Sequence, residues 1–261
     1  MEQTSAIRIE QVNKTFSNKN EVFQVLSDVS LTIEKGEIIS ILGESGCGKS
    51  TLLNIIGGFE KADQGGVYLN GNLVTKPSNH CLMLFQDYGL LPWRSVLKNV
   101  ELGLEQLLIT AGQRRERALH YLALVGLLDR VDLFPHELSG GMKQRVGIAR
   151  ALAMQPELIL MDEPFAALDT FNRYYLQDEL LRIQEHEQTT MIIVTHDIDE
   201  AIYLSDRIFI MHPHPGRIHR EIAVSLEKPR DRSHRDFQYY RKMILEEFHF
   251  NRSEIELEYS I

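Results

Sequence analysis

The chain has little of what marks secreted or membrane-spanning proteins. It contains two cysteines, Cys47 and Cys81, and Cys47 lies in a glycine-rich turn that a disulfide would distort, so cysteine usage fits a reducing cytosol. Residues 1–10 are polar and acidic, without the apolar core of a signal peptide. No run approaches the roughly 18 apolar residues that span a bilayer. We therefore expect a soluble protein whose membrane role depends on partners.

Positive charge is also scarce. The formal net charge is −9, with 28 lysines and arginines against 37 acidic residues, which argues against a nucleic-acid partner. The hydrophobic content of 43% is ordinary for a globular protein. A length of 261 residues allows one large domain or one domain with a substantial insertion.

Residues 43–51 are the most informative stretch that is present. They fit the phosphate-binding pattern GxxxxGK[ST] and lie between a strand-like run, Ile38–Leu42, and a helix-like run, Leu52–Ile56. Glycines let successive backbone N–H groups point at phosphate oxygens beside a positive helix end. Lys49 would reach the β- and γ-phosphates, and Ser50 would bind Mg²⁺. The predicted nucleotide contacts are Gly43, Glu44, Ser45, Gly46, Cys47, Gly48, Lys49, Ser50 and Thr51.

A second apolar run, Leu158–Met161, ends in two adjacent acids. A buried parallel strand would carry the apolar residues, and ligands bind at the carboxyl ends of such strands. Asp162 is then placed to hold Mg²⁺ through water, and Glu163 to orient and deprotonate the water that attacks the γ-phosphate. The alternative is a strand that ends in two solvated acids.

A further helix start has an anion-binding composition. Ser139 is a suitable N-cap for the predicted helix Met142–Met154, and Gly140 and Gly141 expose backbone N–H groups at its positive end. Taken alone, the segment is either a second anion site or a flexible cap.

The remaining pattern predicts an α/β fold. Short strands are expected at Ile7–Val12, Val29–Ile33, Val67–Leu69 and Met191–Thr195, and helices at Glu101–Ile109, Arg114–Val125, Phe171–Glu187 and Phe237–Phe248. Alternating strands and helices predict a mainly parallel sheet in a P-loop NTPase core, with an N-terminal antiparallel β part and an all-helical insertion. We expect residues 1–86 and 151–225 to form the core, 87–150 the helical subdomain and 226–261 a helical tail.

Together these motifs resemble the ATP-binding-cassette (ABC) ATPase family over about residues 6–225. Residues 43–51 are similar to its Walker A loop, Leu138–Gln144 to its signature and Leu158–Glu163 to Walker B. The resemblance implies ATP and Mg²⁺ as ligands. It also implies an aromatic ring against adenine, a Q-loop glutamine that senses Mg²⁺ and the γ-phosphate, a D-loop and a switch histidine. In this sequence Phe16 matches the aromatic position and Gln86 the Q-loop glutamine. Asp169 lies in the D-loop, Ala167–Asp169, and His196 matches the switch histidine. Stacking tolerates either purine, so GTP stays open.

The family also implies a head-to-tail dimer. Each ATP would lie between residues 43–51 of one copy and Ser139–Gly141 of the second, so that Ser139 joins the catalytic groups Glu163, His196, Gln86 and Asp169.

Two segments are similar to the nitrate/sulfonate/taurine branch of importer ATPases. They are Leu91-Pro92-Trp93 and Pro213–Ile218. That branch implies two integral membrane permease subunits, an extracytoplasmic binding protein acting indirectly, and a place on the cytoplasmic face of the cell membrane. Importers of thiamine precursors share much of the pattern, whereas exporters lack Leu-Pro-Trp. A non-transport cassette would carry coiled-coil insertions, a tandem cassette or a basic face.

Three local features leave alternatives. Trp93 either presents an exposed surface to a partner helix or packs inside the helical insertion. His212, His214 and His219 suggest a metal site, but the intervening prolines and the lack of acidic neighbours favour a rigid surface loop. The acidic and aromatic tail is a dimer contact, a regulatory element or plain packing.

Overall fold

The computed structural model describes residues 6–18, 21–84, 89–166 and 168–258, without the side chains of 18 and 249–258. An antiparallel sheet has the strand order β2-β1-β4-β5. Its strands are β1 (Ile7–Asn18), β2 (Glu21–Ile33), β4 (Gln64–Leu69) and β5 (Asn72–Leu73). The predicted segments Ile7–Val12 and Val29–Ile33 therefore belong to two long, directly paired strands.

The second sheet has six strands in the order β10-β9-β3-β8-β7-β6. Strands β3 (Ile38–Gly43), β6 (Cys81–Leu84), β7 (Leu158–Asp162), β8 (Thr190–Thr195) and β9 (Arg207–His212) run parallel, and β10 (Arg217–Ala223) is antiparallel to β9. Every residue of β3 and β8 is buried, as expected for central strands covered on both faces. The predicted mainly parallel sheet is confirmed.

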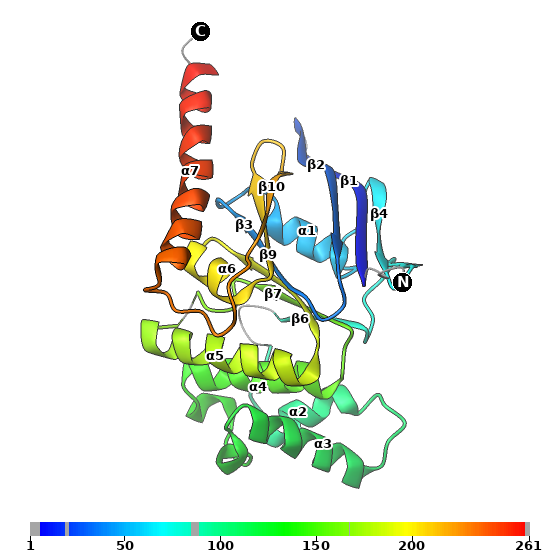
Figure 1. The fold of residues 1–261 in the computed structure, drawn as a ribbon. Coiled ribbons are helices and arrows are strands. Elements are labelled where there is room, and N and C mark those ends of the chain that lie inside the picture. Colours follow the sequence, from blue (N-terminus) through cyan, green and yellow to red (C-terminus); the bar gives the residue numbers. More distant parts are fainter. Residues whose placement is uncertain (1–5, 19–20, 85–88, 167, 259–261) are drawn as a thin grey trace, which may run out of the picture.

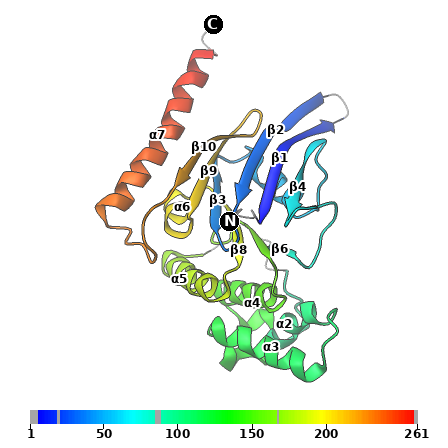
Figure 2. The same ribbon diagram turned by 45° about the vertical axis from the view of Figure 1, so that its right-hand side comes forward.

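Helices cover both faces of this sheet (Figures 1 and 2). Helix α1 (Lys49–Ile56) lies between the two sheets, while α5 (Thr170–Glu187) and α6 (Ile198–Leu204) cover the opposite face. Between β6 and β7 the chain forms a group of α2 (Val96–Leu104), α3 (Ala111–Leu124) and α4 (Gly140–Ala153), with short 3₁₀ turns at Leu128–Arg130 and Pro135–Glu137. An all-helical insertion is thus present.

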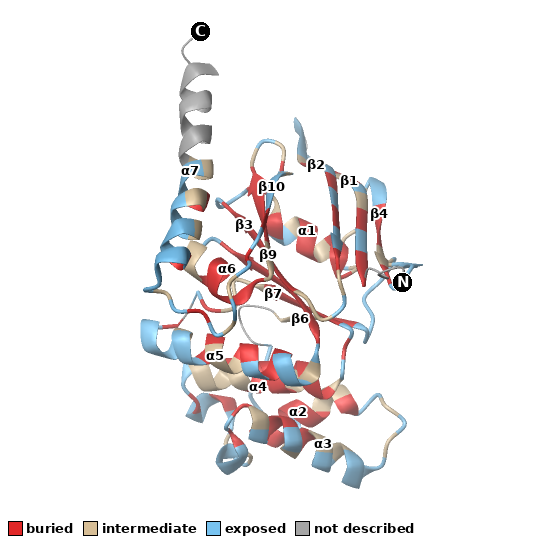
Figure 3. Ribbon diagram, in the orientation of Figure 1, coloured by how far each residue is buried: buried red, intermediate tan, exposed pale blue. Residues whose placement is uncertain are grey.

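Two apolar cores follow from this layering (Figure 3). One lies between the antiparallel sheet, α1 and one face of the six-stranded sheet, where Leu52, Ile9 and Val194 are buried. The other joins the opposite face of that sheet to the helices and includes Leu152, Leu180 and Ile202. The glycine-rich loop of residues 43–51 lies at the edge where these layers meet, because it connects β3 to α1.

Several predicted boundaries are wrong. The helix expected at Glu101–Ile109 is α2, which begins at Val96 behind an N-cap at Ser95 and ends at Leu104. The chain leaves the helix there because Thr110 starts α3 with a capping box to Gln113. The tail helix α7 spans Arg235–Glu258, longer than expected, and lies beside α6 (Figure 1). Within the described residues, no helix is long and apolar enough to cross a membrane.

Candidate functional site

The loop between β3 and α1 depends on glycine for its backbone. Gly46 and Gly48 have φ angles of 83° and 98°, a region that side chains other than glycine rarely adopt. A Cβ on Gly43 would lie 2.6 Å from the Met211 carbonyl oxygen and 2.7 Å from Cys47 Sγ. These glycines let the chain turn sharply against β9 before α1 begins at Lys49.

Lys49 closes the loop from within. Its Nζ donates to the carbonyl oxygens of Gly43 and Glu44, each at 2.8 Å, and the residue is 6% exposed. A buried ammonium group held by two carbonyls is a preformed positive charge at the helix start. It lies where an incoming phosphate would meet the first turn of α1.

Ser50 and Asp162 meet across the loop. The Ser50 side chain lies beside Asp162 at the end of β7. Burial raises the pKa of Asp162 and so does the nearby charge of Glu163, while Ser50 and Lys49 oppose the rise. A half-buried carboxylate beside a hydroxyl is a pair of hard oxygen donors of the kind that Mg²⁺ prefers.

Glu163 points away from that pair and toward His196. Its Oε1 lies 3.0 Å from His196 Nδ1, and its backbone N–H donates to the Val194 carbonyl at 2.9 Å. Glu163 has a φ angle of 47°, an unfavourable conformation for a non-glycine residue that is common at functional sites. This kink separates the directions of two adjacent acids, so that Asp162 faces Ser50 while Glu163 faces His196.

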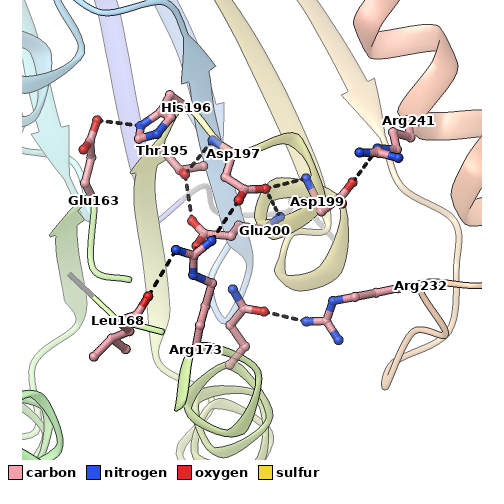
Figure 4. Close-up of polar contacts among 11 residues, drawn as sticks. Glu163, Leu168, Arg173, Thr195, His196, Asp197, Asp199, Glu200, Arg232 and Arg241 are labelled. Carbon is pink, nitrogen blue, oxygen red and sulfur yellow. Dashed lines mark hydrogen bonds and ion pairs between the residues drawn. The ribbon is translucent and has the colours of Figure 1, made fainter. Parts of the chain in front are cut away.

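A polar network lies behind His196 (Figure 4). Thr195 Oγ1 donates to Glu200 Oε2 at 2.8 Å and accepts from the Asp197 N–H at 3.0 Å. Arg173 Nη1 lies 3.3 Å from Asp197 Oδ2 and Arg173 Nη2 donates to the Leu168 carbonyl at 3.3 Å. Burial raises the pKa of Glu200 to about 7. This network is not apparent from the sequence alone, in which Asp197 before a short helix is the one local signal, as an N-cap residue.

A cavity of about 580 Å³ joins the loop to this pair. It is lined by Gly43, Glu44, Ser45, Glu163, His196, Ile198, Leu245 and Phe248. Its volume is in the range of ligand-binding clefts. Residues far apart in the chain thus line one cavity at the carboxyl ends of the parallel strands, where open α/β sheets bind ligands.

The comparison with known families decides the identity of this arrangement. A profile described as "ABC transporter" matches residues 26–166. The chain belongs to the ABC transporter family. It is 43% identical over 246 residues to the aliphatic sulfonates import ATP-binding protein SsuB of Bacillus cereus, covering 94% of this chain and 96% of that protein. It is 41% identical over 232 residues to the nitrate import ATP-binding protein NrtD of Synechococcus elongatus, covering 88% and 85%.

A solved cassette has the same fold. The dimeric structure of a post-hydrolysis state of the ATP-binding cassette MJ0796, bound to ADP and phosphate, is 34% identical and superposes with a TM-score of 0.74. The match covers 85% of this chain and all of that one. The predicted fold class of an ABC cassette is therefore confirmed.

In this cassette the signature segment lies apart from the cavity lining. Ser139 caps α4 by accepting from the Met142 N–H at 3.3 Å. Asp169 caps α5 and accepts from Asn172 Nδ2 at 2.6 Å, which lowers the pKa of Asp169. A Cβ on Gly141 would lie 3.8 Å from Asn172, so the starts of α4 and α5 are neighbours. Within the described residues, neither segment lines the cavity of Glu163 and His196.

Phe16 lies on the arm formed by β1 and β2. Its ring is 6.5 Å from that of its cross-strand partner Phe23, and Lys14 Nζ lies 5.0 Å from the Phe16 ring centroid. Phe16 is half-buried rather than part of the core. Gln86 and Ala167 lie outside the described residues.

Trp93 is 71% exposed, so the alternative that it packs inside the helical insertion is wrong. Its loop is nevertheless held firmly, because Asn99 is fully buried and bonds to four backbone groups. Asn99 Oδ1 accepts from the Leu91 N–H at 2.8 Å, and Asn99 Nδ2 donates to the carbonyls of Leu91, Arg94 and Ser95.

The expectation of a surface loop is wrong for His212, which ends β9 and is 4% exposed. Its ring stacks on that of His219 at 4.1 Å, and burial together with His219 lowers the pKa of His212. An acidic neighbour is present as well, since Glu247 lies 3.2 Å from His219. Across the part of the chain that the structure describes, no group of three His, Cys, Asp or Glu is arranged to hold a metal.

The turn between β9 and β10 supports the loop from behind. The Gly216 N–H donates to the Val25 carbonyl at 2.9 Å, and a Cβ on Gly216 would lie 2.2 Å from the Cys47 carbonyl. Gly216 is therefore a structural partner of the glycine-rich loop of residues 43–51. This contact joins segments far apart in the chain and is not encoded in either segment alone.

Proposed function

We propose that this cassette is the ATP-hydrolysing subunit of a membrane importer of small oxyanion or organosulfur solutes. One observation carries the catalytic part. Ser50 with Asp162 and Glu163 with His196 form two adjacent pairs beside residues 43–51. Phosphoryl transfer to water needs a phosphate cradle, a metal site and a base beside them, and this edge of the sheet carries residues suited to each.

The residues present fit Mg²⁺ and a triphosphate. Ser50 and Asp162 would hold the ion, which when bound neutralises phosphate charge. Lys49, which now donates to the carbonyls of Gly43 and Glu44, would donate to the β- and γ-phosphates instead. Backbone N–H groups of residues 43–51 would bind the phosphate oxygens, and Phe16 would stack on the base.

Glu163 would act as the general base. His196 holds one of its carboxylate oxygens at 3.0 Å, which leaves the second to accept a proton from the attacking water. The network of Thr195, Asp197, Glu200 and Arg173 fixes the end of β8 and thereby the position of His196.

A second copy would complete the site. Ser139–Gly141 and Asp169 start two neighbouring helices outside the cavity lining of their own chain. In a head-to-tail dimer they would close on the phosphates bound by the other copy. The dimeric state of the related cassette MJ0796 supports this arrangement.

The importer part has its own support. Relatives named as sulfonate and nitrate import proteins match this chain over most of its length, and Asn99 presents an exposed Trp93 on a fixed loop. A rigid aromatic group on a surface is a typical anchor for a partner helix. We expect two permease subunits as partners and an extracytoplasmic binding protein that delivers the solute.

The test is ATP hydrolysis by the cassette co-expressed with its permease and reconstituted in vesicles. We expect turnover that rises with sulfonates, taurine or nitrate and that Glu163→Gln abolishes while ATP stays bound. Glu157→Gln, just before the start of β7 and paired with His80, is the matched control. Rapid phosphate release by Glu163→Gln would refute the assigned base. Stimulation by pyrimidines alone would replace the cargo class with thiamine precursors.

A further inference from the structure

Helix α7 contributes two side chains to the catalytic cavity. Leu245 and Phe248 are three residues apart, so they lie on one face of the helix, and both line the cavity with Glu163 and His196. Leu245 is 38% exposed. An exposed leucine beside a proposed phosphate site has no polar role, so its contribution is to shape the cavity and restrict water.

The first half of α7 is firmly attached to the cassette. Phe237 and Ile244 are 1% and 0% exposed within the main apolar core. Arg241 Nε lies 3.0 Å from Asp199 Oδ1 of α6, as Figure 4 shows, and the Tyr240 hydroxyl accepts from the Ser225 N–H at 3.1 Å. These contacts place Leu245 and Phe248 at a defined position over the cavity.

Glu247 fixes the turn between those two residues. Its carboxylate pairs with His219 Nε2 at 3.2 Å and with Arg220, both on β10. The His219 ring stacks on His212, whose ring contacts Phe248 at a centroid distance of 6.3 Å. His212 directly follows Met211, whose carbonyl packs against Gly43. A continuous chain of contacts thus runs from this turn of α7 through the stacked rings of His219 and His212 to Gly43 at the start of the loop.

We propose that Leu245 and Phe248 are positioning residues for ATP hydrolysis. They form an apolar wall on the side of Glu163 and His196, held in place by Glu247. On that side of the cavity the wall limits the access of bulk water to the water that Glu163 activates. Such closure strengthens the local electrostatics and improves the orientation of the reacting groups. The inference rests on the proposed ATPase function and gives the tail a role in it.

The experiment measures ATP hydrolysis by the full-length cassette co-expressed with its permease. Leu245→Ser and Phe248→Ser should each lower kcat about tenfold, with KM for MgATP and the Kd of a non-hydrolysable ATP analogue within about twofold. Phe248→Leu should restore most of the rate because it keeps the wall apolar.

A second pair of variants tests the attachment of α7 to β10 through Glu247 without changing the shape of the side chain. Glu247→Gln should lower kcat like the serine variants. The matched control is Glu246→Gln, the adjacent exposed residue, which pairs with Lys242 at 3.8 Å and should behave like the parent. Circular dichroism melting curves verify that all variants are folded.

The outcomes separate this inference from the function on which it rests. The proposed wall is refuted if the parent cassette hydrolyses ATP while both serine variants and Glu247→Gln keep the parental kcat. It is also refuted by a loss of analogue affinity with kcat unchanged, because that pattern marks residues that bind the ground state and the transition state equally. A parent that neither binds nor hydrolyses ATP overturns the proposed function itself, and the inference with it.

Discussion

Glu200 provides the sharpest test of the electrostatics behind His196. The residue is 5% exposed, accepts from Thr195 Oγ1 at 2.8 Å and lies 3.6 Å from Arg173 Nε. Burial raises its pKa from 4.5 to about 7, and Asp197 adds to the rise, while Thr195, Arg173 and His196 oppose it. The folded protein therefore retains a proton on Glu200 over a pH range in which the unfolded chain has released it.

The sign and size of the effect follow from linkage. Between pH 4.5 and about 7 the folded state binds more protons than the unfolded state at this site, so the free energy of unfolding declines as pH rises through that window. One pKa unit corresponds to about 1.4 kcal/mol, so the full shift amounts to about 3 kcal/mol. Glu200→Gln keeps the shape but cannot ionise. The free energy of unfolding of the variant minus that of the parent should therefore increase by about 3 kcal/mol from about pH 4 to about pH 8.

Urea unfolding followed by far-ultraviolet circular dichroism measures this difference. Parent and variant are compared at several pH values, so that all other titrating groups cancel. Glu116→Gln, on the exposed face of α3, is the matched control for a glutamate-to-glutamine change outside the network. A pH-independent difference for Glu200→Gln, or one of opposite slope, would refute the assignment of a buried, protonated Glu200.

Three further predictions concern the loop, the dimer and the partner surface. Ser139→Arg should leave nucleotide binding largely intact but abolish hydrolysis, because the arginine would block closure by the second copy; unaltered turnover would contradict the shared site. Gly216→Ala should destabilise the protein by about 2 kcal/mol in urea unfolding and weaken ATP-analogue binding, since its Cβ would lie 2.2 Å from the Cys47 carbonyl. Asn99→Ala removes four hydrogen bonds to the Trp93 loop. The substitution should lower the free energy of unfolding by about 2 kcal/mol and reduce the amount of solute transported per ATP hydrolysed. An unchanged ratio of transport to hydrolysis in vesicles would argue against a docking role for that loop.

The features that the sequence predicted correctly are local in the chain. The glycine-rich turn between β3 and α1, the two acids at the end of β7 and the N-cap at Ser139 each lie within one contiguous segment, where residue type alone constrains the backbone. The buried strands β3, β7 and β8 were predicted from their apolar runs, and their parallel arrangement followed from the alternation of strands and helices.

Boundaries were less predictable where capping competes with periodicity. Residues 105–109 have helical spacing but lie outside α2, because Thr110 caps the next helix. Strand β9 carries an apolar run, Ile208–Met211, yet β9, β10 and the short helix α6 were not predicted. A short strand and a two-turn helix give weak patterns, and their stability comes from neighbours in the sheet.

By itself, the sequence determined that this protein is an α/β cassette with a glycine-rich loop between a strand and a helix and two acids at a strand end. Only the tertiary structure showed that Asp162 faces Ser50 while Glu163 faces His196, and that Glu200 is buried behind them. It also brought α7 to the same cavity through Glu247 and the stacked histidines. These contacts join segments distant in the chain, and such contacts depend on how whole elements pack rather than on any local pattern.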